Sequence, residues 1–257
     1  MHFQIKAYIE FLIKSTNEHG VHSPFVFDLV TKCFYDKRKY AEYSVLKEYR
    51  NSLLNDKNII AVTDFGSGSK VFKSNLRQVS QIAKTAGITE NRAELLFRIA
   101  KYFQPEAILE LGTSLGLATV AMSTANPTSN ITTLEGCPET TKIARQLFEK
   151  CGNSNIKSIC TEFETFLKLK TSNHYQLIYF DGNHSKDATL KYVELLTPTI
   201  TNETVWIFDD VHWSADMDDA WNTIKQNPSV TVTIDTFQWG FVFFRREQKK
   251  EHFTVRV

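Results

Sequence analysis

The chain has 257 residues, of which 42% are hydrophobic and 23% are charged, and its formal net charge is +1. This composition is ordinary for a globular protein and excludes a disordered or strongly charged chain. The longest apolar runs are far shorter than the roughly 20 residues that a membrane span needs. The N-terminus carries an acid and histidines where a signal peptide would be apolar. We therefore expect a cytoplasmic protein with no membrane partner.

The first hundred residues have helical periodicity. Ser23-Pro24 is typical of a helix start, with Ser as the cap and Pro in the first turn. Further helices are expected over residues 43–54, 72–86 and 90–103. We interpret residues 1–87 as a helical cap or lid and residues 88–257 as a second domain.

A short apolar run at residues 59–63 leads into a glycine-containing segment, residues 64–69. This pair could be a nucleotide-binding turn. The next thirty residues, however, contain no second strand that ends in an acid, which such a site needs. We therefore expect a loop that closes over a site formed elsewhere in the chain.

From residue 106 short strands alternate with helices, a pattern typical of a parallel α/β sheet. The final two strands are separated by too few residues for a crossover helix, so they must pair antiparallel. The expected strands are residues 107–111, 131–135, 156–160, 176–181, 204–209, 230–236 and 240–246. The expected helices are residues 115–125, 138–151, 163–169, 186–196 and 215–225.

A glycine-punctuated turn follows the first strand of this sheet, in the sequence Glu110-Leu-Gly112-Thr-Ser114-Leu-Gly116. Glycine is needed where the backbone turns tightly and approaches a ligand. Glu135 ends the next strand, nineteen positions after Gly116, where a carboxylate can accept both hydroxyls of a ribose. The alternative for the glycines is a plain tight turn.

Acids follow four of the parallel strands, whose carboxyl ends are where open α/β sheets bind ligands. Such a cluster repels a pyrophosphate but suits a sulfonium cation or a divalent metal. A nicotinamide-dependent oxidoreductase, which would also need Gly-x-Gly-x-x-Gly, remains a weaker alternative. Two of the acids could instead cap the loops that leave their strands. The acids are Glu110, Glu135, Asp181, Asp209 and Asp210.

The chain combines five parallel strands and a final hairpin with three motifs. These are Glu-x-Gly-x-x-x-Gly after the first strand and the runs Phe180-Asp-Gly-Asn-His184 and Phe208-Asp-Asp-Val-His212. Together these features resemble the class I S-adenosylmethionine-dependent methyltransferases. Residues 90–116 resemble the catechol-type O-methyltransferase branch. The whole chain also resembles bacterial methyltransferase-like proteins of unknown substrate. The resemblance implies a Rossmann-like seven-stranded sheet in the order 3-2-1-4-5-7-6, with strand 7 antiparallel, preceded by the helical segment.

The resemblance also implies roles for individual residues. Cofactor contacts fall at Glu110, Gly112, Ser114, Gly116, Glu135, Gly136, Glu162, Phe163 and Asp181. A divalent cation such as Mg²⁺ falls at Asp181, Asp209 and Asp210. The branch has Asn where this chain has Asp210, and its catalytic Lys falls at or near His184.

The reaction that we infer is in-line transfer of a methyl group from a sulfonium sulfur to an oxygen of a small molecule, catalysed mainly by proximity. A carboxylate-bound metal would acidify the acceptor hydroxyl, and a neutral histidine would take its proton. His184 is the first choice for this base and His212 the second, with Asp181 beside them; either histidine could instead be an ordinary surface residue.

Two further functions stay open, a metal-independent, histidine-based methyltransferase and a noncatalytic cofactor-binding protein. Nucleic acid is disfavoured as the acceptor. Amino-methyltransferases acting on adenine and cytosine usually carry Asp/Asn-Pro-Pro-aromatic after the fourth strand, where this chain has Asp181-Gly-Asn-His184. The chain also lacks a basic stripe. The expected partner is a small-molecule substrate, with a homodimer left open.

Overall fold

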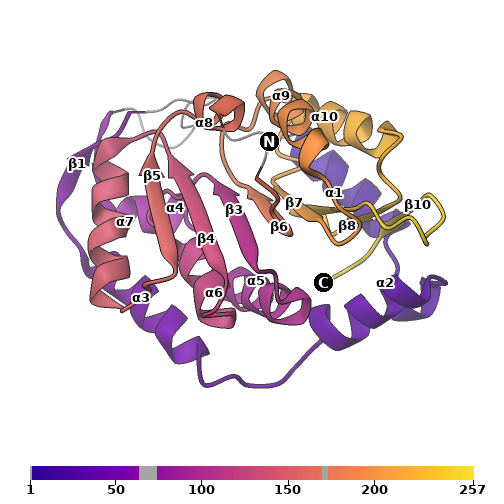
Figure 1. The fold of residues 1–257 in the computed structure, drawn as a ribbon, viewed down its shortest axis with the longest axis horizontal. Helices are drawn as coiled ribbons and strands as arrows, with labels where there is room; N and C mark the ends of the chain where they lie inside the picture. The colour runs from indigo at the N-terminus through magenta and orange to yellow at the C-terminus, as the bar shows by residue number, and fades with distance from the viewer. Residues whose placement is uncertain (1, 64–73, 170–172) are drawn as a thin grey trace. The chain divides into compact units, whose positions relative to one another are not determined.

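The computed structural model describes residues 2–63, 74–169 and 173–257. The chain forms two compact units (Figure 1). The terminal unit comprises Met1–Tyr35 and Leu167–Val257, and the central unit comprises Asp36–Phe166.

The central unit contains three parallel strands in the order β3-β4-β5, side by side in Figure 1. They are β3 (Ala107–Leu111), β4 (Asn130–Glu135) and β5 (Ile156–Cys160), and they match the expected strands to within one residue. The register aligns Leu111 with Leu134 and Glu135 with Cys160, so the three carboxyl ends lie together. This arrangement gives the 3-2-1 part of the expected strand order.

The helices of the central unit, with the exception of α4, agree closely with the expected segments. They are α3 (Tyr43–Asn55), α4 (Val79–Thr85), α5 (Glu90–Phe103), α6 (Leu117–Ala125) and α7 (Pro138–Lys150), followed by α8 (Phe163–Leu169), whose end belongs to the terminal unit. The apolar side chains of α5 and α6 are buried because these helices pack on each other and on α3.

The helix expected over residues 72–86 is wrong in part. Leu76–Gln78 form strand β2, which pairs antiparallel with β1 (Ile59–Ala61), and the helix begins only at Val79. Backbone pairing with β1 has overridden the local helical periodicity. The loop that we expected to close over the site, residues 64–69, lies outside the described residues.

The terminal unit contains strands in the order β10-β8-β9-β7-β6. Strands β6 (Leu177–Phe180) and β7 (Val205–Asp209) are parallel, and β9 (Trp239–Phe243) runs antiparallel to both β7 and β8 (Val232–Asp235). This is the expected 4-5-7-6 order with its antiparallel seventh strand. The eighth strand, β10 (Glu251–Thr254), pairs parallel with β8 and was not predicted.

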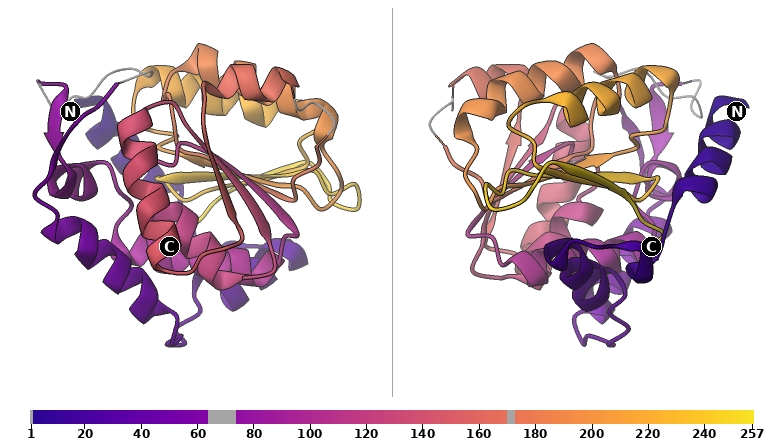
Figure 2. Two further views of the ribbon diagram at one scale, coloured as in Figure 1. Left: turned by 60° about the vertical axis from the view of Figure 1, so that its left-hand side comes forward. Right: turned by 90° about the vertical axis from the view of Figure 1, so that its right-hand side faces the viewer.

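Helices cover both faces of these strands. Figure 2 shows α9 (Lys186–Leu196) and α10 (Ala215–Gln226) side by side on one face. On the other face, α2 (Pro24–Leu29) and a π-helical turn (Val30–Phe34) place Phe25 and Phe34 against Phe243 and Phe241, with ring centroids 5.0 Å apart in both pairs. Phe241 and Phe243 lie on one face of β9 and Gly240 on the other, because successive side chains of a strand point to opposite faces.

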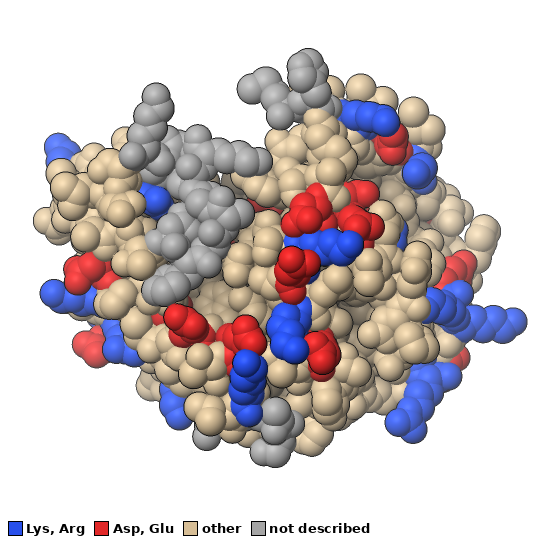
Figure 3. Space-filling model, turned by 90° about the horizontal axis from the view of Figure 1, so that it is seen from above, with Lys and Arg blue, Asp and Glu red and all other residues tan. Residues whose placement is uncertain are grey.

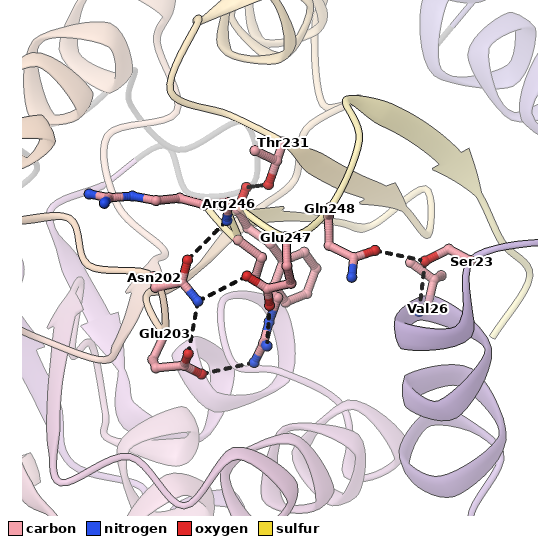
Figure 4. A network of polar contacts seen from close by, with 10 residues as sticks. Ser23, Val26, Asn202, Glu203, Thr231, Arg246, Glu247 and Gln248 are labelled. Atoms are coloured by element: carbon pink, nitrogen blue, oxygen red, sulfur yellow. Dashed lines mark hydrogen bonds and ion pairs between the residues drawn. The ribbon is translucent and has the colours of Figure 1, made fainter.

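The start of α2 confirms the helix signal at Ser23-Pro24. The Ser23 hydroxyl accepts a hydrogen bond from the Val26 backbone N–H at 3.4 Å and donates to Gln248 at 3.3 Å (Figure 4). Figure 4 also shows Asn202 accepting from the Arg246 backbone N–H at 2.9 Å. These contacts attach the segment after β9 to α2 and to the loop before β7. The remaining helices are α1 (His2–Lys14) and the 3-10 turns Glu18–Gly20 and Thr197–Thr199.

The expected boundary at residue 87 does not coincide with a boundary of either unit. Residues 1–35 belong with the C-terminal part of the chain, and residues 36–87 belong with residues 88–166. The physical reason is that α3 packs on α4, α5 and α6, so this part of the expected cap shares a core with the glycine turn.

Candidate functional site

The glycine turn after β3 is held in an unusual backbone conformation. The φ angles of Gly112, Ser114 and Gly116 are 110°, 46° and 82°, all in the region that favours glycine. The backbone N–H groups of Gly112 and Thr113 donate to the Leu134 carbonyl at 3.0 and 3.1 Å. The turn is therefore fixed against the end of β4, as a cofactor-binding turn between two parallel strands must be.

Glu135, the predicted ribose ligand, lies directly on this turn. Its Oε2 accepts from the Ser114 backbone N–H at 2.7 Å, and its Oε1 accepts from the Cys137 N–H at 2.9 Å, at the start of α7. Burial raises the pKa of this carboxyl, and hydrogen bonds from Cys137, Ser114 and Gly136 N–H groups oppose the rise. Each carboxylate oxygen can accept more than one hydrogen bond, so a ribose hydroxyl can still bind.

Glu110, the other predicted cofactor acid of this unit, is fully buried. Its Oε2 accepts from the hydroxyls of Thr119 and Thr133, both at 2.5 Å. Its Oε1 has no hydrogen-bond partner among the described residues. Burial raises the pKa of Glu110 to about 7, against the hydroxyl hydrogen bonds that lower it. The contact between Glu110 and the cofactor stays a prediction.

The predicted adenine contacts follow β5. Glu162 is exposed, and Phe163, half-buried, begins α8. The Thr161 backbone N–H donates to the Glu135 carbonyl at 2.9 Å, which fixes the end of β5 beside the ribose acid. The backbone position agrees with the predicted role of Glu162 and Phe163, and the adenine contact itself stays a prediction.

In the terminal unit the strand register brings two predicted acids together. Phe180 and Phe208 are paired across β6 and β7, so Asp181 and Asp209 follow at the same edge. Asp209 is only 5% exposed. Its Oδ2 accepts from the Tyr179 hydroxyl at 3.2 Å and its Oδ1 from the Asp210 N–H at 2.8 Å. Both oxygens of Asp209 therefore have protein partners.

His184 lies beside Asp181, with its Nε2 3.8 Å from Asp181 Oδ1. The two side chains are 24% and 20% exposed, so both reach solvent. A carboxylate next to a histidine stabilises the imidazolium that forms when the ring takes a proton. The role of this pair as a general base and its neighbouring acid stays a prediction.

His212 has a different environment. Its Nδ1 lies 2.7 Å from Asp218 and its Nε2 2.8 Å from Asp235, and its ring stacks on Phe237. These two carboxylates outweigh the effect of burial and raise the pKa of His212 to about 9. With both ring nitrogens protonated, the ring has no lone pair to accept a proton. The geometry favours His184 over His212 as the base.

The described residues do not include a group of three or more His, Cys, Asp and Glu side chains arranged to hold a metal ion. Asp209 in particular directs both oxygens to protein donors. The chemistry derived below therefore uses no metal. The cation itself remains a prediction.

Several residues that shape the site were not identified from the sequence. Thr119 and Thr133 bind Glu110, and Asp218 and Asp235 enclose His212. They come from neighbouring helices and strands that the fold, rather than local spacing, brings together. Asp218 lies in the first turn of α10. An acid at this place is typical of any helix N-terminus, so the sequence did not mark it as a partner of His212.

Comparisons with known proteins agree with this geometry. Residues 109–211 match a family model described as a methyltransferase domain. A tRNA1(Val) (adenine(37)-N6)-methyltransferase from Flavobacteriaceae bacterium (strain 3519-10) is 32% identical over 121 residues, which are 44% of this chain and 51% of that protein. The chain thus spans about half the length of this curated relative.

Solved structures show the same fold. The SAH-bound methyltransferase PaMTH1 of Podospora anserina is similar with a TM-score of 0.61 at 16% identity, over 88% of this chain and 97% of that one. An O-methyltransferase from Bacillus cereus in complex with SAH has a TM-score of 0.55 at 16% identity, over 81% and 92%. Residues 109–211 thus match a methyltransferase-domain model, and the chain shares the α/β fold of these class I methyltransferase structures.

Proposed function

We propose that the protein transfers a methyl group from S-adenosylmethionine to an oxygen of a small molecule. The observation that carries this proposal is the 2.7 Å hydrogen bond from the Ser114 N–H to Glu135, which joins the strained glycine turn to the acid at the end of the neighbouring strand. A turn and an acid joined in this way suit the ribose of a nucleoside cofactor.

The chemistry of the central unit fits this cofactor. S-adenosylmethionine, when bound, supplies an electrophilic methyl group on a positively charged sulfur. Glu135 accepts the ribose hydroxyls, and the buried Oε1 of Glu110 is an acceptor still without a described donor. The Glu135 carboxylate at this turn favours a cation over a pyrophosphate, which supports a sulfonium cofactor rather than a dinucleotide.

In this proposal a residue of the terminal unit removes the proton of the acceptor hydroxyl. His184 takes this proton at Nε2, and Asp181, 3.8 Å away, stabilises the resulting imidazolium. Oxygen is the acceptor that needs such a base in its first step, because a neutral hydroxyl is a poor nucleophile. The pair therefore supports O-methylation without requiring a metal.

Methylation of an RNA adenine is the second candidate, and the 32% identical relative favours it. The sequence after β6 argues against it, because Asp181-Gly-Asn-His184 replaces the Asp/Asn-Pro-Pro-aromatic motif of such enzymes. Acidic and basic side chains are also interspersed among the described residues on the face in Figure 3, rather than forming a basic stripe there.

Two measurements test the proposal. Calorimetry with S-adenosylhomocysteine should show binding, and Glu135→Gln should weaken it by about 1.5–3 kcal/mol, the scale of a charge-assisted hydrogen bond. Glu149→Gln, at an exposed position of helix α7, which follows β4, is the matched control and should bind normally. Methyl transfer from labelled cofactor should then be measured on phenols, catechols, cell extract and RNA, each with and without EDTA.

Transfer to a hydroxyl compound supports the proposal. Loss of this activity in EDTA would support a metal-assisted reaction. Transfer to RNA alone would replace the proposal with the second candidate. Binding without transfer to any acceptor would indicate a noncatalytic cofactor-binding protein. Equal affinity of wild type and Glu135→Gln would remove the ribose assignment.

A further inference from the structure

Helix α3 contributes a buried hydroxyl to the glycine turn. Tyr49, 2% exposed, donates a hydrogen bond from its hydroxyl to the Leu115 carbonyl at 2.8 Å. Leu115 directly precedes Gly116, the N-cap of α6. Burial raises the pKa of Tyr49, so the hydroxyl stays protonated and acts as a donor. A residue from the expected N-terminal cap therefore holds the backbone of the turn.

The same tyrosine limits the space beside the turn. A Cβ at Gly116 would lie 2.7 Å from the Tyr49 hydroxyl and 2.5 Å from the ring of Phe148, which stacks on Tyr49. Such distances are too short for any real side chain, so Gly116 is required by α3 and α7 in addition to its φ of 82°. The absence of a side chain at Gly116 lets the turn pack against these two rings.

The turn needs anchors because its conformation is costly. Ser114 holds φ at 46°, which costs a non-glycine residue roughly 1–2 kcal/mol. Glu135 fixes Ser114 from the side of β4, and Tyr49 fixes the next residue, Leu115, from the side of α3. Without the second anchor, the Leu115 carbonyl would lose its buried donor and the turn could relax.

We propose that Tyr49 is a positioning residue for the cofactor, which keeps the Gly112–Gly116 turn in its binding conformation through the Leu115 carbonyl. This inference rests on the proposed function, because the turn matters to binding only if it holds S-adenosylmethionine. It assigns to α3 a role in affinity that its place in the sequence does not suggest. If the cofactor binds only the ordered turn, its apparent affinity falls with the fraction of molecules in which the turn has this conformation.

The test compares Tyr49→Phe with wild type and with Tyr35→Phe. Tyr35 is a matched control in the terminal unit, since its hydroxyl also donates to a backbone carbonyl, that of Arg256, at 2.6 Å. Three quantities are measured: hydrogen exchange of the amides of residues 112–117, the dissociation constant of S-adenosylhomocysteine, and the melting temperature. Phenylalanine keeps the ring, so the stack on Phe148 remains.

We expect Tyr49→Phe to speed exchange of the 112–117 amides and to raise the dissociation constant, each by roughly 2- to 10-fold, the range for one hydrogen bond. Tyr35→Phe should change neither, even if its melting temperature falls. A lower melting temperature for Tyr49→Phe with unchanged local exchange and affinity would overturn the proposal and leave Tyr49 a packing residue.

Failure of the proposed function gives a different result. If wild type does not bind S-adenosylhomocysteine, the cofactor assignment is lost. The proposal then falls as a statement about binding, whatever the exchange rates show. If wild type binds and only Tyr49→Phe fails to change the affinity, the cofactor assignment stands and the role of Tyr49 alone is refuted.

Discussion

The two histidines that follow the fourth and fifth strands have opposite chemistry, although both follow an aspartate by two or three positions. His184 faces one carboxylate and solvent, whereas His212 lies between two carboxylates and donates from both nitrogens. A base needs a ring nitrogen that is free to take a proton, and the carboxylates of Asp218 and Asp235 occupy both nitrogens of His212.

This difference predicts the behaviour of two variants. His184→Ala should lower turnover by roughly 10²- to 10⁴-fold, the usual contribution of a general base, with little loss of stability. His212→Gln should instead lower the free energy of unfolding by about 2–3 kcal/mol, because it removes charge-assisted hydrogen bonds to Asp218 and Asp235. Steady-state kinetics and urea unfolding measure the two effects.

His19→Ala is the control, since the His19 side chain is 81% exposed and should be neutral in both measurements. The assignment would be reversed if His212→Gln abolished turnover in a fully folded protein while His184→Ala remained active. Loss of turnover in both variants would mean that His184 and His212 both take part in removing the proton of the acceptor hydroxyl.

At the scale of elements, β9 and α10 approach each other closely at a glycine. A Cβ at Gly240 would lie 2.7 Å from the Trp221 ring and 2.9 Å from Val211. The φ angle of Gly240 is not among the positive values, so space alone requires glycine there. The strand can therefore pack against the fully buried Trp221 only because position 240 has no side chain.

Gly240→Ala should lower the free energy of unfolding by about 1–3 kcal/mol, the cost of overpacking a dense core. Adding Trp221→Phe should relieve part of that cost, so the two changes should be non-additive by at least about 0.5 kcal/mol in chemical unfolding. Gly152→Ala is the control, because a Cβ there meets nothing within 4 Å and its cost comes from φ. Strictly additive effects at positions 240 and 221 would contradict the crowding.

The elements also show where local pattern fails. Residues 76–78 have a helical pattern yet pair with β1, and residues 251–254 carry a single buried apolar side chain, Phe253, yet form β10. In both cases the segment forms backbone hydrogen bonds with another strand of the same unit. Sequence periodicity reports side-chain burial, and it is silent about such pairing.

For the whole molecule, two buried groups make stability depend on pH. The folded-state pKa of Glu110, about 7, lies above its ordinary 4.5, so the unfolded chain loses this proton first and stability falls as pH rises between these values. The pKa of His212, about 9 against 6.5, gives stabilisation that is complete below 6.5 and is lost as pH rises through 9.

We therefore expect the free energy of unfolding to fall from about pH 5 to about pH 9, by up to about 1.4 kcal/mol per pH unit for each proton. Glu110→Gln should flatten the lower part of this curve and His212→Gln the upper part. Denaturant unfolding at several pH values measures both. A wild-type protein that is more stable at pH 9 than at pH 5 would contradict these assignments.

The sequence by itself determined most element bounds, the glycine turn and the acid at the end of the neighbouring strand, and the resemblance supplied the order of the seven expected strands. The element bounds follow from local periodicity, which is written in short stretches of chain, and the place of Glu135 follows from the rule that parallel strands bring their carboxyl ends together. The tertiary structure alone decided that α3 belongs with the turn, that Tyr49 anchors Leu115, and that His212 is enclosed by Asp218 and Asp235. Those contacts join residues from separate elements, and the protonation state of a histidine or a buried acid depends on such neighbours, which spacing in the sequence does not specify.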